Sequence, residues 1–279
     1  MQITLADSRA RPQIAVELNS SRRREMKQIR TLLASLGIAL TTPMILPDAA
    51  VAKADNIVLV HGMNMDGGSW RAVYARLTSD GYNVTVVQLP MTSIEDDIAA
   101  ARRAIDVQDG SVVLVGHSYG GMVISQAGTH PDVKALVYVA AFQPEIGESL
   151  ASLNASIPAE MPQDALRVFD DGYYVVKPEV WITDVANGLP EDDARYTAVF
   201  QTPANTSIFG YTAEAAAWHI APTWAAIATG DRTISPELQR QMSKRSGAKV
   251  IEIDGGHLLQ MSHPEEVAAL IEEAAVAVK

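Results

Sequence analysis

Ser118 stands in the segment VGHSYGG, whose residues have the features expected around a catalytic serine. The apolar residues 112–115 predict a short buried strand, and residues 122–130 predict a helix. Between them, G-x-S-x-G predicts a nucleophile elbow, a turn so tight that the positions two before and two after the serine must be small. Gly116 and Gly120 occupy these positions. We therefore expect a strained Ser118 whose hydroxyl projects above the sheet. A serine that only caps a helix is the alternative.

A serine hydroxyl is a poor nucleophile at neutral pH, so Ser118 requires a general base. His257 is the candidate, because it follows the last predicted strand on a loop whose glycines allow it to reach over the sheet. Two other histidines precede prolines: His263 is expected to open the final helix, and His130 to end the helix after the elbow. His219 has no strand to position it.

A third group must hold the imidazole in the correct tautomer and stabilise its charged form. Asp231 is the candidate, because it comes directly after the fifth predicted strand on a loop before a helix. Glu145, after the fourth strand, is its main competitor, whereas Asp254 is too close to His257 in the sequence to turn back easily.

An acyl-transfer site also needs N–H donors for the oxyanion that develops on the carbonyl oxygen. The residue after the nucleophile, Tyr119, is expected to supply one, and the loop after the first strand the other. In that loop Met63 N–H is the best choice. We expect His61 to brace the loop through hydrogen bonds instead of acting as a second base.

Short apolar runs alternate with helical segments along most of the chain, which predicts a parallel sheet with helices on both faces. Chemistry in such sheets lies beyond the carboxyl ends of the strands. The expected strands are 56–62, 83–89, 112–115, 134–141, 224–230 and 248–254, and the expected helices include 69–80, 93–107, 236–246 and 264–277.

The alternation stops over residues 143–223, which are irregular and rich in proline, acidic residues and aromatic residues. An insertion after the fourth strand would lie over the strand ends as a cap. We expect most of its nine aromatic side chains to form the core of the cap and about a third to face an apolar substrate pocket.

The first 54 residues differ in composition from the rest. A basic segment at 21–27, an uncharged segment at 31–47 and small residues at 50 and 52 follow the order of a secretory signal peptide. Ser21, Arg22, Arg23 and Lys27 also match the spacing of a twin-arginine signal, although Glu25 stands where that signal prefers an aromatic. We expect cleavage near Ala52 and a periplasmic or secreted mature protein, residues 55–279.

Two alternatives bear on this leader. Met26 as the true start would remove the arginine pair. A membrane anchor is disfavoured, because the uncharged segment is short and is interrupted by Pro43 and Pro47. The mature chain is therefore expected not to insert stably in a membrane.

Overall composition limits the chemistry further. The chain of 279 residues has no cysteine, which excludes disulfides, cysteine–zinc sites and a thiol nucleophile. Its six histidines are scattered, so no metal site is expected. The net charge of −11 disfavours nucleic acid and anionic lipid as partners.

The motifs together resemble those of the α/β-hydrolase superfamily. They are HG at 61–62, GHSYGG at 116–121, DRTISP at 231–236 and GH at 256–257, with AAF at 140–142 and SHP at 262–264. The chain is similar to small bacterial serine esterases of the plant methylesterase and hydroxynitrile lyase group over residues 55–279. The resemblance implies an α/β-hydrolase fold with a mostly parallel six-stranded sheet, a triad of Ser118, Asp231 and His257, and oxyanion amides at Met63 and Tyr119.

Three family branches are disfavoured by the residues at one or two positions. Hydroxynitrile lyases of this group carry threonine and lysine where Gly62 and Leu258 stand here. Haloalkane dehalogenases and epoxide hydrolases have an aspartate in place of Ser118.

We therefore predict a serine hydrolase that cleaves a small or medium, apolar carboxylic ester through an acyl-enzyme, without cofactor or metal. A lactonase or cofactor-free perhydrolase on the same triad is the alternative among enzymes. A small-molecule receptor with a vestigial triad is the alternative outside enzymes.

Overall fold

The computed structural model describes residues 54–278. The predicted leader therefore lies outside the described residues, apart from Ala54. Within the described part, no helix is both long and apolar enough to cross a bilayer.

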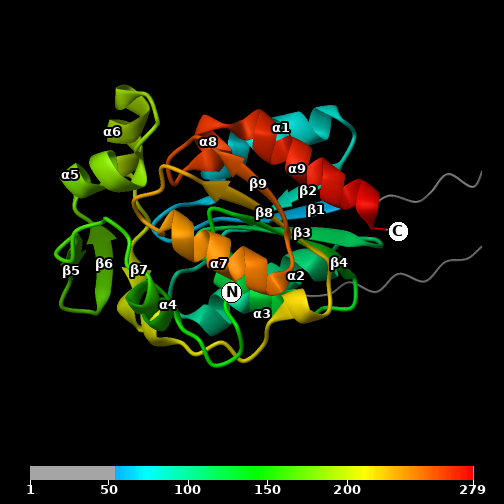
Figure 1. The fold of residues 1–279 in the computed structure, drawn as a ribbon, viewed down its shortest axis with the longest axis horizontal. Helices are drawn as coiled ribbons and strands as arrows, with labels where there is room; N and C mark the ends of the chain where they lie inside the picture. Colours follow the sequence, from blue (N-terminus) through cyan, green and yellow to red (C-terminus); the bar gives the residue numbers. More distant parts are fainter. Residues whose placement is uncertain (1–53, 279) are drawn as a thin grey trace, which may run out of the picture. The chain divides into compact units, whose positions relative to one another are not determined.

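Six parallel strands form the central sheet in the order β2-β1-β3-β4-β8-β9 (Figure 1). Their bounds are β1 Asn56–Val60, β2 Asn83–Val86, β3 Val112–His117, β4 Val133–Val139, β8 Thr223–Ala228 and β9 Lys249–Ile253. The inner strands β1, β3 and β8 are buried along their whole length, because helices cover both faces. The predicted α/β fold with a six-stranded sheet is confirmed, and every pairing in this sheet is parallel.

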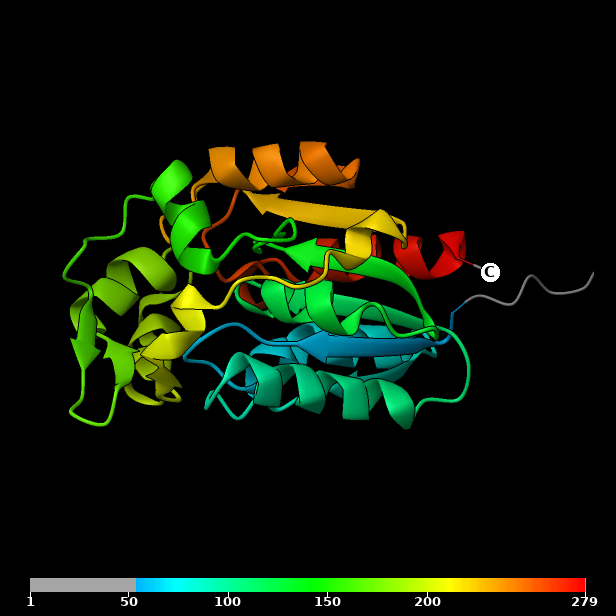
Figure 2. The ribbon, with the colours of Figure 1, turned by 90° about the horizontal axis from the view of Figure 1, so that it is seen from below.

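Two layers of helices enclose the sheet. One layer contains α1 (Arg71–Ser79), which continues from the 3-10 turn η1 (Gly67–Trp70), with α8 (Leu259–Ser262) and α9 (Pro264–Ala277). The opposite layer contains α2 (Ile94–Asp106), α3 (Gly120–Ala127) and α7 (Pro236–Ser246), which lie across the near face of the sheet in Figure 2. Each layer packs on its own apolar cluster, so the two faces have separate cores.

The predicted helices over 236–246 and 264–277 end at the predicted residues, but the second strand is shorter than the predicted 83–89. The strand ends at Val86. Val87 N–H still donates to Leu59 O of β1, but Leu89 N–H donates to the ring of His61 and no longer to a strand carbonyl.

Most of the residues between β4 and β8 gather at one end of the sheet, at the left in Figures 1 and 2, whereas residues 217–222 lie beside α3 and lead back to β8. We call residues 143–222 the cap. It contains α4 (Leu150–Ser156), a small antiparallel sheet of β5 (Leu166–Val168), β6 (Tyr173–Val176) and β7 (Ala204–Asn205), then α5 (Pro178–Val180), η2 (Trp181–Val185), α6 (Glu191–Val199), η3 (Thr206–Gly210) and η4 (Ala217–His219). The sequence pattern does not predict the small sheet, whose strands are too short for a period of two to be recognised.

Candidate active site

Ser118 lies in the turn between β3 and α3 with a φ of 54°, which is the left-handed region that residues with a Cβ rarely adopt. The turn is held by backbone hydrogen bonds: Ser118 N–H donates to Val139 O at 3.2 Å, and Phe142 N–H donates to Ser118 O at 3.1 Å. Neighbouring strand β4 therefore maintains the strained conformation that projects the hydroxyl out of the sheet.

The glycines of the elbow are required by close backbone contacts. A Cβ on Gly116 would lie 2.5 Å from Gly120 O, and a Cβ on Gly120 would lie 2.7 Å from Val60 O. Neither contact can be relieved by a side-chain movement, since both partners are backbone atoms. The prediction that these two positions must be small is confirmed.

Ser118, His257 and Asp231 form one continuous hydrogen-bonded chain. His257 Nε2 lies 2.9 Å from Ser118 Oγ, and His257 Nδ1 lies 2.7 Å from Asp231 Oδ2. All three side chains are buried. The loops after three different strands, β3, β8 and β9, thus bring together the residues that the sequence placed at their carboxyl ends.

Asp231 is held by more than the histidine. Its Oδ1 accepts from the N–H groups of Thr233 and Ile234, at 2.8 and 2.9 Å. Its Oδ2 accepts from Gln239 Nε2 at 2.8 Å in addition to His257. A buried carboxylate with this many donors is satisfied as an anion, and with Oδ2 as acceptor His257 carries its proton on Nδ1.

The competing residues lie elsewhere. Glu145 pairs with His219 at 3.0 Å in an exposed position on the cap. His130 pairs with Asp106 beyond the end of α3. His263 precedes α9, as predicted, and its Nδ1 lies 2.9 Å from Ser262 Oγ.

Three residues that support the triad were not predicted from the sequence. Gln239 on α7 reaches Asp231, as described above. Asn187 on the cap donates to Gly230 O at 2.8 Å, and its Oδ1 lies 3.4 Å from His257 N. His117 Nε2–H donates to His257 O at 3.0 Å. Burial, together with His257 nearby, holds the pKa of His117 well below its usual value, so this ring is neutral.

The N–H groups of Met63 and Tyr119 are the predicted oxyanion donors. Within residues 54–278, neither N–H donates a hydrogen bond to a protein acceptor. Both residues line the same cavity as Ser118. His61 braces the loop as expected: its Nε2 accepts from Leu89 N–H at 3.0 Å, so its Nδ1–H donates to Gly62 O at 2.9 Å.

The side chain of Tyr119 turns away from the serine. Its hydroxyl donates to Asp97 Oδ2 at 2.6 Å, and Asp97 Oδ1 accepts from Met91 N–H at 2.9 Å. Desolvation of this fully buried carboxyl raises the pKa of Asp97 to about 6, in spite of the two donors. The same burial, with Asp97 as second cause, raises the pKa of Tyr119 well above its usual value.

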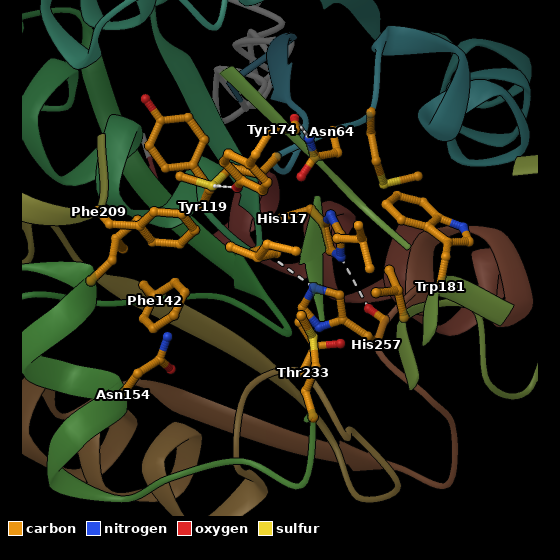
Figure 3. A pocket seen from close by; sticks show the side chains of 18 residues that line it. Asn64, His117, Tyr119, Phe142, Asn154, Tyr174, Trp181, Phe209, Thr233 and His257 are labelled. Carbon is orange, nitrogen blue, oxygen red and sulfur yellow. Dashed lines mark hydrogen bonds between the residues drawn. The ribbon is translucent and has the colours of Figure 1, made fainter. Parts of the chain in front are cut away.

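A cavity of ≈ 110 Å³ opens in front of Ser118 and His257. The cap contributes half of the residues that line it, and Figure 3 shows Trp181 on one side of His257 with Phe142 and Phe209 on the other. The wall is mainly apolar; its cap residues are Leu150, Asn154, Met161, Leu166, Tyr174, Val176, Trp181, Val185 and Phe209. Asn154 is a polar exception, and its Oδ1 is buried without a hydrogen-bond partner in the described structure.

The cap aromatics divide differently from the expectation. Three of the nine line the cavity, which matches the expected third: Tyr174, Trp181 and Phe209. The expectation that most form the core of the cap is wrong, because Phe169, Tyr196 and Phe200 are exposed. Among the described residues, no cluster of three or more acidic or histidine side chains has the arrangement of a metal site.

An α/β sheet with a strained serine at the carboxyl end of its third strand defines the class of this fold. A family model described as the alpha/beta hydrolase family matches residues 57–270, and the chain belongs to this family. The resemblance to the α/β-hydrolases stated from the motifs is thus confirmed.

Similar proteins are named as esterases and hydrolases. The carbendazim hydrolyzing esterase of Nocardioides sp. (strain SG-4G) is 35% identical over 135 residues, 43% of this chain and only 54% of that relative, about half its length. Methylesterase 7 of Arabidopsis thaliana is 28% identical over 78% of this chain and 95% of its own. The solved structure of a pyrethroid hydrolase from Sphingobium faniae JZ-2 has a TM-score of 0.67 at 25% identity, covering 79% and 96% of the two chains. These names support the predicted carboxylic ester hydrolase activity.

Proposed function

We propose that this protein is a serine hydrolase that cleaves carboxylic esters through an acyl-enzyme intermediate. The observation that carries the proposal is the hydrogen-bonded chain from Ser118 through His257 to Asp231, at the base of a mainly apolar cavity. Membership of the alpha/beta hydrolase family and the esterase names of its relatives agree with it.

In the acylation step, Ser118 Oγ attacks the ester carbonyl carbon while its proton passes to His257 Nε2. Asp231 Oδ2 accepts from His257 Nδ1–H and stabilises the imidazolium that forms. The carbonyl oxygen becomes an oxyanion, which accepts from the N–H groups of Met63 and Tyr119. The intermediate then collapses: the C–O bond to the alcohol breaks, and His257 gives its proton to the departing oxygen.

In the deacylation step, a water molecule replaces the alcohol. His257 takes a proton from it as the water attacks the acyl carbon, and Ser118 leaves with that proton. The acid product dissociates. The apolar wall of the cavity favours substrates whose acyl or alcohol part is hydrocarbon or aromatic.

A fluorophosphonate labelling experiment with wild type and Ser118→Ala tests this proposal, together with hydrolysis of a panel of nitrophenyl esters. We expect one covalent adduct on Ser118, none on the variant, and a fall in kcat on the order of 10⁶-fold. A folded wild type that neither takes the label nor hydrolyses any ester would refute the proposal.

We also propose that the protein is exported and that the leader is removed near Ala52. The basic, uncharged and small-residue segments in that order support this. The intact mass of the protein recovered from periplasm or medium would locate the cleavage, and an uncleaved chain in the cytosol would contradict it.

A further inference from the structure

Asn64, in the loop that follows β1, links that loop to the cap. Its Nδ2 donates to Tyr174 O at 3.2 Å and to Thr202 O at 3.1 Å. In return, Thr202 N–H donates to Asn64 O at 3.2 Å. Two carbonyl acceptors around one amide end define which end of the side chain is the nitrogen. The backbone and side chain of Asn64 therefore both bind the cap, at β6 and at the segment before β7; Figure 3 shows Asn64 next to Tyr174 of β6.

The backbone of Asn64 is in an unfavourable conformation. Its φ is 57°, in the left-handed region, and its side chain is buried with 3% exposure. Asparagine tolerates this region better than other residues with a Cβ, but the conformation is retained only where surrounding contacts fix it. Here the contacts that fix it come from the cap.

The preceding residue is held from the same side. Tyr174 OH donates to Met63 Sδ at 2.7 Å, and both side chains line the cavity. The peptide that joins Met63 to Asn64 therefore lies between two residues that both bind the cap, Met63 through its sulfur and Asn64 through its side chain and carbonyl oxygen. The N–H of Met63, which is free to bind a ligand, belongs to the next peptide toward Gly62.

We propose that Asn64 is a positioning residue that makes the Met63 amide an effective oxyanion donor only while the cap is docked. The inference rests on the proposed function. When the cap segments move away, Asn64 loses its partners, its strained backbone relaxes, and the amide of Met63 turns from the oxyanion. Docking of the cap on a substrate thus completes the site as well as enclosing it.

The test compares Asn64→Gly and Asn64→Asp with Asn205→Ala. Glycine can adopt the left-handed backbone without strain, but it removes the side-chain amide that binds Tyr174 O and Thr202 O, so the loop is no longer fixed. Aspartate keeps the size and the backbone preference but directs a carboxylate oxygen at two carbonyl oxygens. Asn205 is a matched control, because its side chain accepts only from Ser207 N–H within the cap and does not touch the loop.

Complete loss of an oxyanion donor typically lowers kcat by about 10²–10³-fold. We expect the misplaced amide of Asn64→Gly to lower kcat by about 10- to 100-fold with KM changed less than threefold, and Asn64→Asp to lower it further. Binding of a trifluoromethyl ketone, which forms an oxyanion on the serine, should weaken in proportion to kcat. Asn205→Ala should change neither.

Amide hydrogen exchange measured by mass spectrometry separates this inference from the proposed function, because it needs no substrate. Exchange over residues 173–176 and 201–205 should accelerate in both Asn64 variants. A wild type that hydrolyses no ester would refute the proposed function, whereas the exchange data would still report the link. The inference is overturned if folded Asn64→Gly retains the kcat of wild type, or if its kcat falls while exchange in the cap is unchanged.

Discussion

The sheet and the cap hold the two proposed oxyanion residues in different ways. Tyr119 belongs to the sheet side: it opens α3, and its hydroxyl is bound by the buried Asp97 of α2. Met63 and Asn64 are bound mainly by the cap, through Tyr174 and Thr202. One donor is thus fixed within the sheet and its helices, while the other depends on the inserted region.

The difference shows where rigidity and adaptability lie in this molecule. The elbow is fixed by backbone contacts that no side chain can relax, as at Gly116 and Gly120. The cap has short strands and exposed aromatic side chains, and it is linked to the loop by a few hydrogen bonds. We expect substitutions on the sheet side to affect chemistry and stability strongly, and substitutions in the cap to affect substrate choice.

The largest effect in this comparison is expected for Asp231→Asn. An asparagine can keep the Thr233 and Ile234 N–H donors on its oxygen, but its amide nitrogen then faces His257. The imidazole would take the tautomer that cannot accept the proton of Ser118, which lowers kcat by roughly 10⁴-fold. Stopped assays on a nitrophenyl ester would measure this, with melting temperature as the check on folding.

Glu145→Gln is the matched control for that substitution. Glu145 also follows a strand, β4, but it pairs with His219 on the exposed surface. We expect kcat to change less than twofold. A comparable loss in both variants would show that Asp231 is not the acid of the triad.

The sheet and the positions of Ser118, Asp231 and His257 at its carboxyl edge could be predicted because their signals are local. Uninterrupted apolar runs mark the strands, and Gly116 and Gly120 around Ser118 mark the elbow. Since carboxyl ends of parallel strands share one edge, the positions of Asp231 and His257 after strands were enough to bring them to the serine.

The supporting residues and the cap could not be predicted in the same way. Gln239 looks like any polar residue on a helix, and only the packing of α7 beside β8 directs its amide to Asp231. His117 occupies a variable position of the elbow motif, and its role depends on the His257 carbonyl, 140 residues away. In the cap, composition indicates aromatic side chains but not which ones face inward, because segments without a regular period have no readable face.

A smaller effect on the sheet side is expected from pH, through Asp97. Its pKa is about 6 in the folded protein against 3.8 when unfolded. Between these values the folded state keeps a proton that the unfolded state has lost, so stability falls as pH rises. Relative to Asp97→Asn, the free energy of unfolding of wild type should fall by up to about 3 kcal/mol between pH 4 and 7. Urea titrations at several pH values would measure it.

Asp96→Asn, on the same turn of α2, tests a carboxylate whose contribution to stability changes with pH in the opposite direction. Hydrogen bonds from Thr92 and Ser93 lower the pKa of Asp96, so this carboxylate stabilises the fold above the unfolded pKa and loses that effect as pH falls. Equal pH profiles for Asp97→Asn and wild type would mean that the Tyr119 side chain is not held by an ionising partner.

The smallest effect is expected in the cap, for Asn154→Leu. The buried Oδ1 of Asn154 lacks a partner in the described structure, and a leucine of similar size removes that unsatisfied atom from an apolar wall. Removing one such group stabilises a protein by about 1 kcal/mol, which corresponds to a melting temperature about 2–4 °C higher. Scanning calorimetry measures the shift, and Asn154→Ala, which removes the same atom but leaves a void, should show no gain.

Because the amide faces the cavity, Asn154→Leu should also change substrate preference. We expect the leucine variant to hydrolyse alkyl esters at least as well as wild type. Its kcat/KM should fall about tenfold on esters that carry a hydroxyl on the part of the substrate that contacts residue 154. A leucine variant that melts lower than wild type would show that the amide is satisfied in solution and that this part of the cap is as closely specified as the sheet.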